Sequence, residues 1–180
     1  MSVSLLLENE ESHRLLYRKV ESSDFSSWLP FHEEPLSMQY FVGNIPNPKE
    51  ACKAWFDKVF FRYEKDLGGH NALISKETGK LIGMCGLLIQ TVDDKEELEI
   101  GYSILPEYWR NGYASEAAKQ CRIYATKHQL SASLISIIHV DNIGSQKVAI
   151  SNGMCLDKHT NYKGIPVQIY RRHIKNKPSI

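Results

Sequence analysis

The sequence predicts a single α+β domain. Segments with the periodicity of amphipathic helices are interspersed along the chain with short runs of strand-forming residues. No linker rich in proline, glycine or serine divides the 180 residues, so we interpret residues 1–180 as one domain. Hydrophobic residues make up 42% of the chain and charged residues 24%, which is typical of globular proteins and excludes wholesale disorder.

The charges are nearly balanced, with 22 Lys and Arg against 21 Asp and Glu. This balance gives no electrostatic reason to expect a nucleic acid or an anionic membrane as the main partner. No stretch approaches the roughly 18 uninterrupted apolar residues of a transmembrane helix. The N-terminus contains three leucines but lacks the cationic start of a signal peptide, so we expect a cytoplasmic protein.

The four cysteines stand alone, without a CxxC pair or a close histidine partner. A zinc site requires clustered ligands, and a disulfide scaffold requires more cysteine in a shorter chain. We therefore expect no bound metal and four reduced, buried thiols, at Cys52, Cys85, Cys121 and Cys155.

The first quarter of the chain predicts a strand, a short helix and a loop. Residues 14–20 are rich in strand formers. Residues 22–24 offer several N-caps for a helix, which Pro30 is expected to end. Four prolines in and around residues 30–47 predict an irregular, aromatic-rich loop that packs over the core or lines a cleft.

A second helix is predicted to begin at residues 47–50, which combine an N-cap asparagine, a proline at the first helical position and a glutamate at the third. It is expected to end before Gly68 and to bury a face formed by Ala51, Trp55, Val59 and Phe60. The apolar runs 71–75 and 80–90, joined by a turn at 77–79, predict a β-hairpin.

The middle of the chain predicts a solvated acidic loop, a third strand and a third long helix. Residues 93–97 form the acidic loop, and residues 97–105 form a strand that Pro106 ends. From Gly112 onward, small and apolar residues recur at helical spacing, at Ala114, Ala117, Ala118, Cys121, Tyr124 and Ala125.

The last third predicts a strand over 133–140 and a short helix over 143–152. Gly153 follows this helix, and glycine supplies the left-handed residue that ends many helices. Residues 155–159 and 166–172 then predict a last hairpin.

The segment 97–118 is the most informative for chemistry. It predicts a strand, a sharp proline-containing turn and a helix that opens with glycine and small residues. The N–H groups of a first helical turn have no intrahelical partners and carry partial positive charge. Residues 110–115 therefore fit a cradle for a pyrophosphate, and the alternative is a structural helix without a ligand.

Residues 109–114, Trp-Arg-Asn-Gly-Tyr-Ala, resemble the acetyl-CoA-binding motif of the GCN5-related N-acetyltransferases, the GNAT family. The tryptophan in the first place resembles the RimJ/RimL-like branch, which includes ribosomal-protein N-terminal and spermidine acetyltransferases. Residues 142–145 followed by 153–154 resemble the family's second motif, Asn-x-x-Ser…Gly-Phe. A weaker match is residues 14–24, so the resemblance covers almost the whole chain.

The resemblance implies the fold in more detail. We expect a mixed, mostly antiparallel central sheet of about six to seven strands, flanked by about four helices. The sheet would be splayed at the cofactor site, between the strands 98–105 and 133–140.

The resemblance also implies acetyl-CoA as cosubstrate. The backbone of Tyr102, Ser103 and Ile104 would pair with the pantetheine arm, with the Ile104 N–H directed at the thioester oxygen. Asn142 would hydrogen-bond the pantetheine, with Ser145 nearby. The pyrophosphate would bind the backbone amides of the helix start, at Arg110, Asn111, Gly112, Tyr113, Ala114 and Ser115.

The implied chemistry is direct attack of a primary amine on the thioester in a ternary complex. The amine must first lose a proton, and Glu99 is our candidate base; the alternatives are a surface carboxylate at Glu99 and a base at His139. Many relatives carry a tyrosine that protonates the thiolate where this chain has Ala149. The proton donor would then be Ser145, Tyr170 or water, or the thiolate would leave unassisted.

The acceptor would be a protein N-terminus of the ribosomal-protein type or a small amine such as a polyamine. Glu33 and Glu34 would attract a cationic amine, although a solvated acidic loop is the simpler interpretation. A rival hypothesis is a catalytically weak or inactive CoA-binding sensor or interaction module. We expect a monomer or a homodimer, with no membrane or nucleic acid required. No Gly-x-Gly-x-x-Gly follows a predicted strand, which excludes a Rossmann enzyme.

Overall fold

The computed structural model describes residues 3–43 and 45–174. Seven strands form one sheet: β1 (Leu15–Lys19), β2 (Gly68–Ser75), β3 (Leu81–Val92), β4 (Lys95–Ile104), β5 (Ser133–His139), β6 (Cys155–Tyr162) and β7 (Ile165–His173). Their order in the sheet is β1-β2-β3-β4-β5-β7-β6. β4 and β5 are parallel and the other neighbouring pairs are antiparallel, which confirms the predicted mixed, mostly antiparallel sheet.

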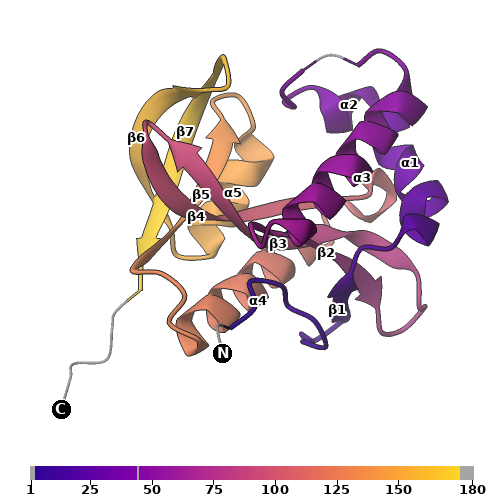
Figure 1. The fold of residues 1–180 in the computed structure, drawn as a ribbon, viewed down its shortest axis with the longest axis horizontal. Coiled ribbons are helices and arrows are strands. Elements are labelled where there is room, and N and C mark those ends of the chain that lie inside the picture. Colours follow the sequence, from indigo (N-terminus) through magenta and orange to yellow (C-terminus); the bar gives the residue numbers. More distant parts are fainter. Residues whose placement is uncertain (1–2, 44, 175–180) are drawn as a thin grey trace.

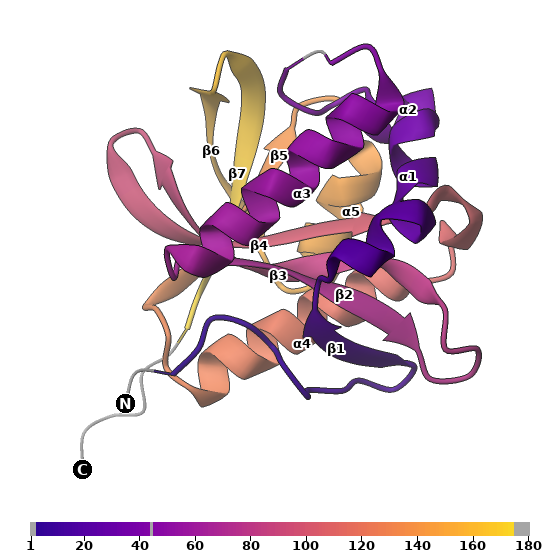
Figure 2. The ribbon, with the colours of Figure 1, turned by 45° about the vertical axis from the view of Figure 1, so that its right-hand side comes forward.

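Helices cover both faces of the sheet. The α-helices are α1 (Phe25–Glu33), α2 (Pro35–Met38), α3 (Pro48–Glu64), α4 (Tyr113–Lys127) and α5 (Ile143–Ser151), with short 3-10 turns at η1 (Ser22–Asp24) and η2 (Pro106–Tyr108). α1 and α3 pack together on one face of the β1–β4 half, and α4 packs on the opposite face (Figures 1 and 2). α5 packs beside α4 and contacts β5 and β7. The α+β class is confirmed.

Two apolar clusters fill the spaces between the sheet and its helices. One lies under α4 and includes Ile100, Ala117 and Cys121. The other lies under α1 and α3 and is centred on Trp28, which is fully buried and stacks on Phe31 with ring centroids 4.5 Å apart. The sheet between the two clusters is therefore fixed on both faces, and its strands form a rigid support for the residues that project from their ends.

The prediction that Pro30 ends the first helix is wrong. α1 continues through Pro30 to Glu33, and α2 follows inside the segment that was expected to be irregular. Pro30 lies in the second turn of a nine-residue helix, so its missing N–H removes one intrahelical hydrogen bond. Trp28 and Phe31 come before and after Pro30 in this helix, and the burial of their stacked rings stabilises it.

The predicted buried face of α3 is also partly wrong. The buried residues are Cys52, Phe56, Val59 and Arg62. Of the predicted face, Val59 is buried, Phe60 is exposed and Trp55 is half-buried at the wall of a cavity. Both stripes pass through Val59 at helical spacing, so periodicity alone does not distinguish them.

The acidic segment 93–97 is not a solvated loop throughout. β4 already begins at Lys95, and the carboxylate of Glu97 is buried against the guanidinium of Arg171 on β7, at 2.8 and 2.9 Å. The partners are 74 residues apart in sequence, so the acidic run by itself gives no indication of the pair. Asp93 and Asp94 form the tight β3–β4 turn in left-handed conformation.

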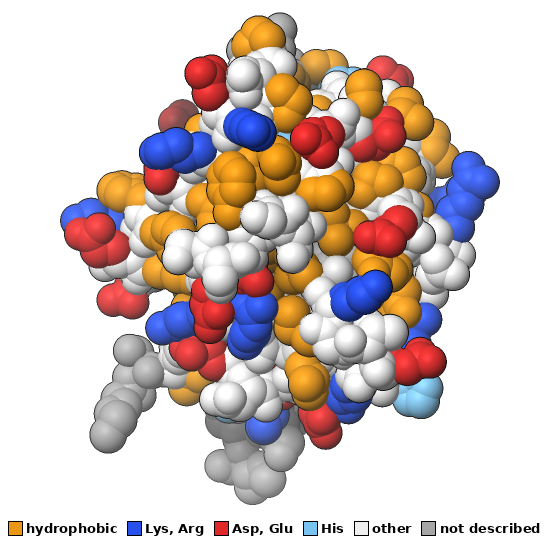
Figure 3. All heavy atoms as spheres, turned by 90° about the vertical axis from the view of Figure 1, so that its right-hand side faces the viewer, with side chains coloured by type: hydrophobic (Ala, Val, Ile, Leu, Met, Phe, Trp, Pro, Cys, Tyr) orange, Lys and Arg blue, Asp and Glu red, His pale blue; other side chains and the backbone are white. Residues whose placement is uncertain are grey.

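Three of the four thiols are buried as predicted, and Cys155 is not. Cys155 is exposed at the start of β6, which is the last strand at its edge of the sheet. In the part of the chain that the structure describes, no helix is long and apolar enough to cross a membrane. The face turned toward the viewer in Figure 3 carries apolar side chains between scattered charges of both signs, consistent with the balanced composition.

Candidate active site

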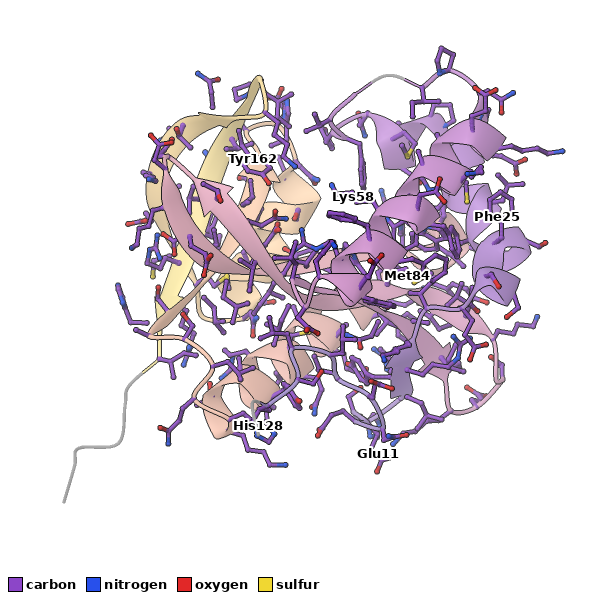
Figure 4. The ribbon with its side chains drawn as sticks, viewed as in Figure 1. Glu11, Phe25, Lys58, Met84, His128 and Tyr162 are labelled. Carbon is purple, nitrogen blue, oxygen red and sulfur yellow. The ribbon has the colours of Figure 1, made fainter. Side chains whose placement is uncertain are left out.

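A cavity of about 630 Å³ lies along the second half of β4. One wall is formed by α3 and the segment of α1 and α2, and the other by β5, the start of α5 and the β6–β7 hairpin. Figure 4 labels Lys58 on α3 and Tyr162 on β6, which lie on the two sides of this cavity. The cavity is large enough for part of a cofactor and a small second substrate.

β4 and β5 separate at this cavity. Only one residue pair, Glu99 with Ile135, joins β4 to β5 in the sheet, whereas every residue of β4 pairs with a residue of β3. Just beyond that position, the Ser136 hydroxyl donates to Ile100 O at 2.9 Å. After Ile100 the edge of β4 is open toward β5, which is the splay that the sequence predicted.

The backbone of β4 alternates between its two neighbours. Leu105 N–H donates to Ile82 O at 3.0 Å, so the odd-numbered residues of β4 turn their N–H and C=O groups toward β3. Tyr102 and Ile104 consequently turn theirs toward the open edge. Ser103 turns its backbone toward β3, and only its side chain faces the cavity.

The turn before α4 has an unusual backbone. Arg110 and Gly112 have φ of 60° and 78°, and Gly112 is the N-cap of α4. Both are left-handed, and they turn the first amides of α4 toward the end of the cavity, where Arg110, Tyr113 and Ala114 line its wall. A side chain at Gly112 would be strained, so glycine is required here.

The rest of the predicted cradle is fixed by neighbouring groups. Arg14 donates to Asn111 O at 3.0 Å, forms an ion pair with Glu116 at 2.7 Å and lies over the Tyr113 ring. The Ser115 hydroxyl accepts a hydrogen bond from Ser151 at 3.2 Å. These contacts fix the start of α4, which limits the ordering that a bound anion would require.

Asn142 and Ser145 lie on the opposite side of the splay, at the start of α5. Asn142 is its N-cap, and its side-chain oxygen accepts from the Ser145 N–H at 3.1 Å. The Tyr102 phenol reaches across the splay, donates to Ser145 O at 2.8 Å and accepts from the Ser145 hydroxyl at 3.0 Å. Burial raises the pKa of Tyr102, so its phenol keeps its proton at neutral pH.

Glu99 lies in the floor of the cavity and is not a surface carboxylate. Gln90 donates to Glu99 Oε2 at 2.7 Å, and the Tyr162 hydroxyl donates to Gln90 Oε1 at 3.0 Å. Burial raises the pKa of Glu99, while the hydrogen bonds from Gln90 and the Ile137 N–H and the charge of Arg62 act in the opposite direction. A carboxyl group with a raised pKa and a fixed orientation can accept a proton near neutral pH.

Three basic side chains from α3 and β2 surround Glu99 at longer range: Lys58, Arg62 and His70. Burial, together with the charges of Arg62 and Lys58, lowers the pKa of His70 to about 3, so its ring is neutral. The His70 ring lies beside Gly101, where an added Cβ would come within 3.3 Å of Nε2. These three residues are absent from the predicted site because nothing in their spacing links them to β4.

The alternative catalytic groups have different surroundings. His139 lines the cavity, faces the Tyr40 ring at 4.9 Å and accepts from the Asp141 N–H at 3.1 Å. Tyr170 is buried in the core under α4 and is not part of the cavity wall. The position at which many relatives carry a tyrosine is occupied here by Ala149, which is buried in the same core.

Glu33 and Glu34 are not in the cavity wall. The Glu34 carboxylate caps α2 by accepting from the Leu36 N–H at 3.2 Å, and Glu33 is exposed. The geometry therefore supports the simpler interpretation of solvated carboxylates, but Glu33 ends α1 and Glu34 caps α2, so the two do not form a loop. Within the described ranges, no group of three or more His, Cys, Asp or Glu side chains could hold a metal ion.

The sequence profile of the acetyltransferase (GNAT) domain matches residues 14–155, which is most of the chain and includes the splay, the α4 turn and the start of α5. The chain belongs to the GNAT family. This assignment confirms the resemblance of its two motifs and agrees with the geometry of β4 and α4.

Individual GNAT relatives and solved structures are moderately or distantly similar. YkkB of Bacillus subtilis (strain 168), an uncharacterized protein, is 33% identical over 101 residues, which cover 56% of this chain and 59% of YkkB. An acetyltransferase structure from Agrobacterium tumefaciens str. C58 aligns with a TM-score of 0.77 and 22% identity, covering 96% of this chain and 98% of that one. The RimL ribosomal L7/L12 acetyltransferase with coenzyme A aligns with a TM-score of 0.71 and 15% identity, covering 92% and 97%.

The residues of this GNAT domain fit acetyl-CoA. The open edge of β4 offers the N–H and C=O groups of Tyr102 and the N–H of Ile104, which another strand would otherwise use, while the Ile104 C=O accepts the Trp109 indole N–H. The first turn of α4 offers amides for phosphate groups. Both features line or adjoin one cavity, so a ligand with a peptide-like arm and a pyrophosphate matches the donor set.

Proposed function

We propose that this GNAT domain transfers an acetyl group from acetyl-CoA to a primary amine by direct attack in a ternary complex. One observation carries the proposal: a single cavity joins the open edge of β4 to a fixed carboxylate, Glu99, with a raised pKa. The family match and the coenzyme A complex of the structurally similar RimL support acetyl-CoA as the acyl donor.

The cofactor would lie along the splay. Tyr102 and Ile104 would pair their backbone with the pantetheine arm, and the pyrophosphate would accept hydrogen bonds from the amides of residues 110–115. The Ile104 C=O already accepts the Trp109 indole N–H at 2.7 Å, which fixes the end of β4. The Ile104 N–H would then stabilise negative charge on the thioester oxygen during attack.

Proton transfer follows from the position of Glu99. An acceptor ammonium gives one proton to the Glu99 carboxylate, and the free amine attacks the thioester carbonyl carbon. The C–N bond forms and the C–S bond breaks. The amine nitrogen loses its second proton, which passes to the thiolate through a neighbouring hydroxyl group, and this yields an amide and CoA as a thiol. Glu99 then releases the first proton to solvent.

Two joined hydroxyl groups are candidates for protonating the thiolate. Ser145 was predicted from the second motif, and the Tyr102 phenol forms hydrogen bonds with it in both directions. Since Tyr102 retains its proton, it can supply the function of the tyrosine that Ala149 replaces. The acceptor is proposed to be a small amine or a protein N-terminus.

The proposal is tested by Glu99→Gln, with Glu96→Gln as the matched control from the same acidic segment. Glu96 is exposed and is not part of the cavity wall, so its variant should behave as the unaltered protein. The Glu99 variant should lose turnover by about a hundredfold or more with an amine acceptor, measured as CoA formed by chromatography. Its affinity for CoA should be unchanged in calorimetry.

Unchanged turnover in the Glu99 variant would remove Glu99 as the base and leave the enzyme class intact. Binding of CoA by the unaltered protein without transfer to any amine would favour the rival hypothesis, a CoA-binding sensor or interaction module.

A further inference from the structure

The charged side chains around the cavity do not balance. Among the described residues, the wall contains four cationic side chains and one carboxylate: Lys58, Arg62, Arg110 and Lys163 against Glu99. Arg110 belongs to the turn before α4, at the end of the cavity proposed for the phosphates. The other three cations surround the end where the acceptor amine would meet Glu99.

Among the described residues, Arg62 is a buried cation with no carboxylate at ion-pair distance, and the charge of Glu99 acts on it only at longer range. The residue is 7% exposed, and its Nη2 donates to Leu67 O and Ile89 O, both at 2.6 Å. Its Nε is buried and has no hydrogen-bond partner among the described residues. Burial lowers the pKa of Arg62, which reflects the cost of holding this charge away from water.

Lys58 and Lys163 approach the same space from opposite walls, α3 and the β6–β7 turn. Lys58 and Lys163 are both exposed residues, so water reaches them. Partial burial of Lys58 and the positive charges of Lys163 and Arg62 lower the pKa of Lys58, and the charge of Glu99 acts in the opposite direction. None of the ion pairs found among the described residues includes Lys58, Arg62 or Lys163. Like charges that share a cavity repel one another. Glu99 offsets one of these three positive charges, so two remain for an anionic ligand to offset.

We propose that the acceptor is a small amine that also carries an anionic group, a carboxylate or a phosphate, bound among these three cations while its amine faces Glu99. This inference rests on the proposed function. Aromatic side chains of the same wall, including Phe31, Trp55 and Tyr162, cover the apolar part of such an acceptor. Amino acids and aminoalkyl phosphates have this chemistry, and polyamines do not.

The test compares acceptors that differ in the anionic group. The L-forms of phenylalanine, leucine and methionine are paired with their carboxamides, and phosphoethanolamine is paired with ethanolamine; spermidine is the polycationic comparison. We expect kcat/KM to be at least about tenfold higher for the anionic acceptor, either in the amino-acid pairs or in the phosphoethanolamine pair. The pairs that show this preference identify the bound anionic group as a carboxylate or a phosphate. Equal or higher kcat/KM for the members that lack the anionic group, or for spermidine, would overturn the inference.

Variants connect the preference to the cations. For each pair of acceptors, kcat/KM of the anionic acceptor is divided by kcat/KM of the acceptor that lacks the anionic group. Lys58→Gln and Lys163→Gln should each reduce this ratio by about three- to tenfold. Lys53→Gln is the matched control, because Lys53 lies on α3 outside the cavity wall and pairs with Asp57 at 2.7 Å. A ratio unaffected by both cavity variants would contradict the assignment.

A binding measurement separates this inference from the proposed function. If no amine is acetylated, the proposed function fails, and calorimetry of the CoA-loaded protein with N-acetylphenylalanine, its carboxamide and inorganic phosphate still tests the cation cluster. If N-acetylphenylalanine or phosphate binds, and Lys58→Gln weakens that binding, the inferred anion-binding site is supported. Equal binding of carboxylate and carboxamide, or no binding of any of the three, would overturn it.

Discussion

Glu99 has the surroundings of a group that exchanges protons. Its carboxylate accepts from Gln90, which is itself held by Tyr162, so its orientation is fixed by a chain of side chains from three strands. Burial dominates its pKa, and the hydrogen bond from Gln90 partly offsets that effect. An unpaired surface carboxylate would have neither the raised pKa nor the fixed orientation.

Removing the donor from Glu99 should move the pH profile in a defined direction. In Gln90→Leu the carboxylate loses a hydrogen bond that favours its charged form, so the pKa of Glu99 should rise further. The acid limb of the kcat/KM profile should then shift to higher pH, because the base is unprotonated only above its pKa. An acid limb that stays in place or moves to lower pH would show that Glu99 does not control it.

The β4 strand depends on a second carboxylate, Glu97, for its connection to the last hairpin. Its side chain is 6% exposed, and it forms a two-pronged ion pair with Arg171, which also contacts Asp157 at 3.0 Å. Arg171 holds the pKa of Glu97 below its ordinary value. The ion pair therefore stabilises the fold fully above the pKa of the unfolded chain, and this stabilisation is lost as pH falls through the folded-state pKa.

Glu97→Gln should lower the free energy of unfolding at neutral pH by about 3 kcal/mol, at the low end for a broken buried pair because Asp157 still neutralises Arg171. The difference from the unaltered protein should shrink as pH falls below the ordinary glutamate pKa of about 4.3, and it should vanish below the lowered folded-state pKa of Glu97, where the carboxylate is protonated in both states. Urea unfolding at neutral and acid pH measures both effects, and Glu96→Gln is again the control. A difference that does not depend on pH would contradict the ion-pair account.

The order of the elements was predictable because each element has a local cause. The asparagine cap and proline at the start of α3, the glycine turn between β2 and β3, and the small residues of α4 all lie within a few positions of the structure that they determine. The error at Pro30 has a tertiary cause, since the packing of α1 on α3, with the Trp28 and Trp55 ring centroids 5.5 Å apart, outweighs a local helix breaker.

The sequence led to the cofactor side of the candidate site and to Glu99, but not to the cations of the acceptor side. Motif residues near Gly112 and Asn142 are contiguous in sequence, so the resemblance of two short motifs was enough to propose them. The acceptor side brings together Lys58, Glu99 and Lys163 from three separate elements. No local pattern joins them, and they become neighbours only when the sheet order places β6 and β7 next to β5, opposite α3.

At the scale of the whole molecule, we propose that acetyl-CoA binds in the splay with its phosphates at the start of α4. Isothermal titration of acetyl-CoA tests this claim with a matched pair of variants, Gly112→Trp and Gly79→Trp. Both glycines are left-handed, at φ of 78° and 68°, so both variants carry comparable backbone strain, but Gly79 lies in the open β2–β3 turn away from the cavity.

We expect micromolar binding to the unaltered protein and to Gly79→Trp, and loss of binding in a folded Gly112→Trp. Circular dichroism verifies that both variants are folded. Absence of acetyl-CoA binding to the unaltered protein, or equal binding to both variants, would contradict it.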